Sequence, residues 1–123
     1  MNMERWEKLE VWKIANQFAL NVYSVTKGFP REEVYGITSQ LRRAVLSVPT
    51  NIVEGYSRKG DKELSRFLDI AFASLAEVKY LLYFSKELGY INDEYDKLKD
   101  VSSEVGSKLW KFMESVRGNK LVK

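Results

Sequence analysis

The chain contains no cysteine and no histidine among its 123 residues. Without cysteine it has no disulfide, no thiolate metal site and no cysteine nucleophile. Imidazole is the commonest general base and metal ligand near neutral pH, so the lack of histidine removes most other familiar catalytic arrangements. The glycine-based motifs of nucleotide-binding folds and serine hydrolases are absent as well. The composition therefore predicts a protein that is not an enzyme and that uses no metal or cofactor.

The sequence also lacks a long uncharged hydrophobic segment. A membrane-spanning helix needs roughly 18 or more consecutive apolar residues, whereas the longest apolar region, residues 70–84, is interrupted by Glu77 and Lys79. The first residues show neither the apolar core nor the cleavage site of a signal peptide. These features predict a cytoplasmic protein.

Glycine and proline are scarce, with seven and two residues, and the glycines separate four segments of helical periodicity. The predicted helices cover residues 7–27, 36–58, 62–88 and 93–117. Links of three to eight residues between these ranges favour antiparallel neighbours. The chain is therefore predicted to be all-α, with residues 1–123 forming a single domain, an antiparallel up-down-up-down four-helix bundle.

Three residues carry specific predictions about helix geometry. Gly28 and Gly89 follow the first and third predicted helices, where a left-handed glycine commonly ends a helix. Pro49 lies inside the second helix and cannot donate to the Val45 carbonyl, which predicts a kink but not a break.

The third predicted helix is more apolar than a bundle helix in a monomer needs to be. Between Leu64 and Leu88, 16 of the 25 residues are apolar, whereas a face of about 100° is enough to cover a core. Phe72, Tyr80 and Tyr83 lie largely off the main stripe. The helix is predicted either to have a wide buried face or to use these aromatic residues in an interface between copies of the chain.

Ser47, Thr50 and Asn51 form a strip of short polar side chains beside Pro49 on the second helix. Another backbone can approach such a strip closely. Two interpretations remain open: the strip contacts another subunit, or it packs inside the bundle.

Positive charge is concentrated in residues 35–59. This stretch holds one acid, Glu54, and four basic residues, so its net charge of +3 equals that of the whole chain. Basic residues contact phosphate groups in nucleic-acid complexes. The alternative is a solvated face with charges that complement helix dipoles. The predicted phosphate contacts are Arg42, Arg43, Arg58, Lys59 and Arg66.

The stretch from Tyr35 to Gly55 reads YGITSQLRRAVLSVPTNIVEG. It resembles the second helix of the four-helix bundle proteins encoded in 23S rRNA intervening sequences. Further agreement comes from LEVW at residues 9–12, ELSRFL at 63–68 and ASLAE at 73–77. The departures are Ala73, where the family often has glycine, and Val53, where it often has alanine.

This resemblance implies an antiparallel four-helix bundle that assembles as a homopentamer around a central channel, in a family for which no enzymatic activity is established. Together with the charge pattern, it predicts a non-enzymatic homo-oligomer that binds RNA or DNA. The alternative is a structural or scaffold module that binds a protein partner through the apolar third helix.

Overall fold

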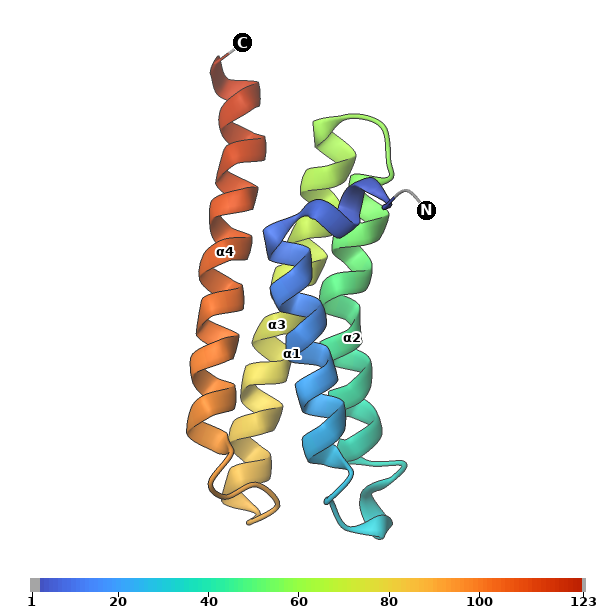
Figure 1. The fold of residues 1–123 in the computed structure, drawn as a ribbon, viewed down its shortest axis with the longest axis vertical. Helices are drawn as coiled ribbons and strands as arrows, with labels where there is room; N and C mark the ends of the chain where they lie inside the picture. The colour runs from blue at the N-terminus through green and yellow to red at the C-terminus, as the bar shows by residue number, and fades with distance from the viewer. Residues whose placement is uncertain (1–2, 123) are drawn as a thin grey trace.

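The computed structural model describes the backbone of residues 3–122 and the side chains of residues 3–118. Its four α-helices are α1 (Glu10–Thr26), α2 (Ile37–Tyr56), α3 (Asp61–Glu87) and α4 (Tyr95–Val122), with short 3-10 helices at η1 (Arg5–Lys8) and η2 (Arg31–Glu33). No strand occurs within residues 3–122. Helices α1 and α3 run in one direction and α2 and α4 in the other (Figure 1). The predicted all-α four-helix bundle is confirmed.

Helix boundaries differ from the predicted ones at both ends of the chain. The first α-helix begins at Glu10 and not at residue 7, because extended backbone at Leu9 (φ −75°, ψ 124°) separates it from η1. The last helix continues beyond residue 117 to Val122. Helix α2 runs through Pro49 as one element, as predicted.

The two predicted glycine caps have different outcomes. Gly89 is left-handed (φ +80°), and the Tyr90 and Gly89 N–H groups donate to the carbonyls of Ser85 and Lys86, both at 2.9 Å. These two bonds form the Schellman motif and confirm that cap. The prediction for Gly28 was wrong. The N–H groups of residues 27, 28 and 29 each donate to the carbonyl three residues earlier, so the last turn of α1 tightens without a left-handed residue.

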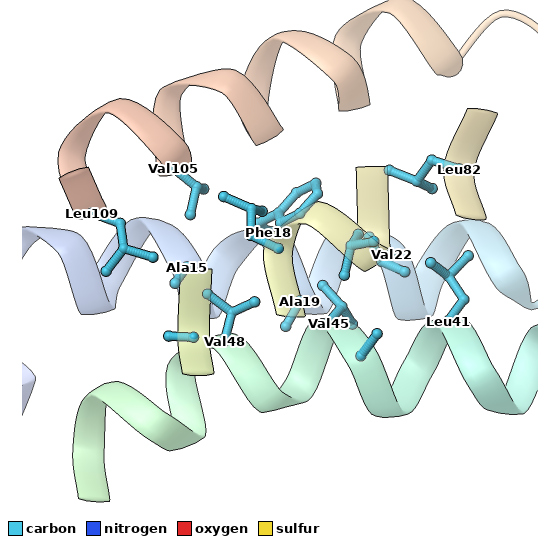
Figure 2. Close-up of a cluster of buried hydrophobic side chains, with 14 of the residues drawn as sticks. Ala15, Phe18, Ala19, Val22, Leu41, Val45, Val48, Leu82, Val105 and Leu109 are labelled. Atoms are coloured by element: carbon cyan, nitrogen blue, oxygen red, sulfur yellow. The ribbon is translucent and has the colours of Figure 1, made fainter. Parts of the chain in front are cut away.

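A continuous apolar core lies between the four helices. Figure 2 shows side chains from all four of them converging, among them Phe18, Val45, Leu82 and Leu109. Phe18 and Leu109 are fully buried. The core also includes Gly55 of α2, where a Cβ atom would lie 2.7 Å from the Cβ of Phe67 on α3. Helices α2 and α3 therefore approach each other there with no room for a side chain.

At the end of the bundle opposite Gly55, side chains hold together the link before α2 and the link after α3. The Tyr90 hydroxyl donates to the Glu33 carboxylate (2.8 Å), which raises the pKa of Tyr90. The second carboxylate oxygen of Glu33 accepts the Ile37 N–H (3.2 Å). The rings of Tyr90 and Phe29 also pack, with centroids 5.4 Å apart. The link after α3 is thereby fixed to η2 and to the start of α2.

Among the described residues, none of the helices combines the length and apolar character required to span a membrane.

Candidate nucleic-acid interface

Four cationic residues gather where α2 turns into α3, and we call Arg58, Lys59, Lys62 and Arg66 the basic turn. Gly60 permits the reversal with φ +85°. The Cζ atoms of Arg58 and Arg66 lie 5.1 Å and 4.6 Å from the ring centroid of Phe67. Phe67 itself is 6% exposed. Cation–π contacts with a buried ring therefore position both guanidinium groups.

The basic turn contains one ion pair, between Arg66 and Glu63 at 3.1 Å. The hydrogen bond from Arg66 lowers the pKa of Glu63, and the same bond raises the pKa of Arg66. Both side chains are largely solvent-exposed, so the pair adds little to stability. Lys59 and Lys62 are exposed as well. Asp61 also lies in this turn, so residues 58–66 carry four cations and two carboxylates, a net charge of +2.

Arg5 lies at the same end of the bundle and was missed by the sequence-based prediction. Its Cζ atom lies 5.0 Å from the ring centroid of Tyr56, in the last turn of α2. An edge contact between Trp6 and Trp12, with centroids 4.8 Å apart, ties η1 to α1. Because Arg5 belongs to no amphipathic pattern, nothing in the sequence indicates that it reaches α2.

Arg42 has a structural role. Its Nε–H donates to the Thr26 hydroxyl (2.8 Å), and an Nη2–H donates to the Tyr23 carbonyl (3.1 Å). Its guanidinium also lies over the Tyr23 ring, 4.7 Å from the centroid. Arg42 therefore binds α2 to the C-terminal turn of α1, where a cation complements the helix dipole.

The five predicted phosphate contacts form two groups. Sixteen residues separate Arg42 from Arg58, which is about 24 Å along a helix. Arg43 is exposed, but it is one residue from Arg42 and about four turns from the basic turn. The structure brings together only Arg58, Lys59 and Arg66.

Arg42→Met is expected to lower the free energy of unfolding by about 1–2 kcal/mol, because two hydrogen bonds between α1 and α2 are lost. Arg43→Met, one position away on the exposed face, should change it by less than about 0.5 kcal/mol. Urea unfolding followed by circular dichroism compares the two variants. Equal stability of both would contradict the structural role of Arg42.

The polar strip on α2 is mostly used inside the subunit. The hydroxyls of Ser47 and Ser74 lie 2.8 Å apart, which joins α2 to α3. The Asn51 side-chain amide donates to the Ser47 carbonyl and hydroxyl, at 2.8 Å and 2.9 Å. These contacts favour packing inside the bundle for two of the three residues. Thr50 is exposed.

Five of the exposed large apolar residues lie on α3 and the residue that follows it, and we call them the α3 face: Ile70, Tyr80, Tyr83, Phe84 and Leu88. Their exposed fractions range from 40% for Ile70 to 60% for Tyr80. Tyr80 and Tyr83 belong to the predicted interface, whereas Ile70, Phe84 and Leu88 were not selected. Phe72, which was selected, is half-buried and packs against Trp110 of α4, with ring centroids 5.7 Å apart.

The sequence model of 23S rRNA-intervening sequence proteins matches residues 7–111. The chain belongs to this family. The matched range includes the whole basic turn and the whole α3 face, but not Arg5 or the last turns of α4. No curated protein sequence matches the chain.

The fold of this family member is similar to that of a solved protein from Bacteroides thetaiotaomicron VPI-5482. That crystal structure is described as a protein with unknown function from the S23 ribosomal protein family. The two share 21% sequence identity and superpose with a TM-score of 0.77, over 85% of this chain and 95% of the other. At this identity the similarity supports the fold alone.

Proposed function

We propose that this 23S rRNA-intervening sequence protein is a non-enzymatic homo-oligomer that binds RNA or DNA through the basic turn. The observation that carries the proposal is the pair of guanidinium groups held on Phe67 next to two exposed lysines. Arginine and lysine contacts to phosphate oxygens supply most of the affinity of non-specific nucleic-acid binding.

Oligomerisation would raise the affinity for nucleic acid. The chain has a net charge of only +3, which gives a weak field around one subunit. In the pentamer implied by the family resemblance, five such chains carry +15, and several basic turns face the nucleic acid together. Multivalent contacts raise affinity without any new contact type. The exposed apolar residues of the α3 face support the contact between copies.

Binding of a fluorescent RNA, followed by anisotropy, tests the basic turn. The affinity should fall steeply between about 50 and 200 mM salt, because counterions are released on binding. The triple variant Arg58→Glu, Lys59→Glu and Arg66→Glu should bind about 100-fold more weakly and show a smaller salt slope.

The matched control is Lys13→Glu, Lys97→Glu and Lys99→Glu, which changes the net charge equally at exposed sites outside the basic turn. If both triple variants lose the same affinity, general charge and not the basic turn drives binding. If the unmodified protein binds neither RNA nor DNA at low salt, the proposal is wrong.

A second candidate function is a scaffold that binds a protein partner through the α3 face, because this face carries five exposed apolar residues. A partner recovered from a lysate after nuclease treatment, and lost when Tyr80 is replaced by glutamate, would favour the scaffold function.

A further inference from the structure

We propose that a second anion site, distinct from the basic turn, binds a phosphoryl group in the cavity between the end of α1, η2 and the first turn of α2. The cavity has a volume of about 410 Å³, within the range of small-molecule sites. Lys27, Arg31, Arg42 and Thr38 supply its polar groups.

The charge of the cavity wall is entirely positive. Three of the lining side chains are cationic, and no carboxylate lines the cavity. A dianionic phosphate can accept charge-assisted hydrogen bonds from these cations. The cavity also lies between the negative C-terminal end of α1 and the start of α2, where the Glu33 carboxylate already caps the Ile37 N–H, so its attraction for an anion comes from the cations.

Thr38 adds a hydroxyl to the three cations of the cavity. This side chain is only 6% exposed, yet its hydroxyl forms no hydrogen bond with another group of residues 3–118. Every side-chain polar atom sealed from solvent in that part of the chain has a partner. The Thr38 hydroxyl must therefore face the open cavity that its side chain lines. A hydroxyl that reaches the cavity and binds no other protein group is free to bind a ligand oxygen.

Arg42 is already oriented for such a ligand. Its bonds to Thr26 and to the Tyr23 carbonyl use Nε and one Nη2 hydrogen. Of the five N–H groups of a guanidinium, three then remain for other acceptors. Because the guanidinium is fixed before binding, less side-chain entropy is lost when a phosphate binds.

The remaining wall is apolar and includes Phe29 and Val34. Phe29 is 8% exposed and packs against Tyr90, whereas Val34 is about half exposed. This wall suits the organic part of a phosphorylated molecule. The phosphoryl group has two candidate sources: a small phosphate ester, or a phosphate of the nucleic acid bound elsewhere on the protein.

The test is a titration of the ¹⁵N-labelled protein with inorganic phosphate and with adenosine monophosphate, in a buffer of low ionic strength. Amide signals around Thr38 and Arg42 should shift and saturate. Thr38→Val and Arg31→Gln should each weaken binding about 10-fold or more, since each removes a hydrogen bond to a charged group. Lys59→Gln, in the basic turn, should leave phosphate binding unchanged.

Thr38→Val also separates a ligand role from a structural one. Since the hydroxyl has no protein partner, the variant should be as stable as the unmodified chain or slightly more stable. If phosphate causes no saturable shift, if chloride causes the same shift, or if Thr38→Val binds phosphate normally, the site does not exist. In that case the three cations of the cavity only complement the negative C-terminal end of the α1 dipole.

RNA binding identifies the source of the phosphoryl group. If Thr38→Val weakens both phosphate and RNA binding, the site holds a phosphate of nucleic acid. If it weakens phosphate binding alone, the ligand is a small phosphate ester. Charge reversal in the basic turn should leave phosphate binding intact, so failure of the nucleic-acid proposal is distinguishable from failure of this one.

Discussion

Replacing Tyr80 and Phe84 together by glutamate is expected to convert the proposed oligomer into a monomer. The two rings are neighbours on the α3 face, with centroids 6.1 Å apart, and are 60% and 43% exposed in the single subunit. In an interface these positions would be dehydrated, and a buried unpaired carboxylate costs several kcal/mol. Two such charges per contact should raise the Kd by several orders of magnitude.

Light scattering coupled to gel filtration measures this effect directly. The double variant should have the mass of one chain, 14.3 kDa, whereas the unmodified protein should have a multiple of it. The matched control is Gln17→Glu with Leu20→Glu, two exposed positions on α1 that leave the α3 face untouched. A monomeric unmodified protein, or a double variant that keeps the full mass, would exclude the α3 face as the subunit contact.

Gly55→Ala is expected to lower the free energy of unfolding by about 2–3 kcal/mol. The new Cβ would lie 2.7 Å from the Phe67 Cβ and 3.1 Å from a methyl carbon of Leu64. Phe67 Cβ is attached directly to the backbone, so α2 and α3 must separate along their closest contact. This loss is a large share of the roughly 5–15 kcal/mol that stabilises a typical domain.

Gly106→Ala provides the matched comparison, because Gly106 is also a buried glycine within a helix. Its Cβ would meet Leu75 at 3.4 Å and the Lys79 ammonium at 3.5 Å, both ordinary contacts. Alanine is the better helix former by about 1 kcal/mol, so this variant should be at least as stable as the original chain. Urea unfolding of both variants tests the difference, and similar midpoints would contradict the close approach at Gly55.

The fold was predictable because it depends on local patterns. Apolar residues at helical spacing and a glycine such as Gly89 mark the helices and one of their ends without knowledge of any neighbour. The start of α1 and the end at Gly28 were less predictable. Both depend on the detailed backbone path of a connecting segment, where several kinds of turn satisfy the same hydrogen-bonding groups.

The candidate site was only partly predictable, because a sequence indicates which residues are charged but not what they touch. Arg42 and Arg43 have equal charge and adjacent positions, yet only Arg42 meets the Thr26 hydroxyl and the Tyr23 carbonyl on another helix. Similarly, the bond between Ser47 and Ser74 depends on how α2 is rotated against α3. Periodicity specifies the buried stripe of a helix but not the neighbour along each edge of that stripe.

The placement of the tryptophans has a consequence for how unfolding can be observed. Trp6 packs on Trp12 near the start of α1, and Trp12 lies about 21 Å along that helix from Thr26. Trp110 lies at a comparable distance, about 22 Å, from the start of α4. Indole emission therefore monitors the half of the bundle that contains the basic turn, whereas the far-ultraviolet helix signal monitors the whole chain. If the end around η2 opens first, the helix signal will begin to fall before the emission changes. Coincident curves would instead show that both halves unfold as one cooperative unit.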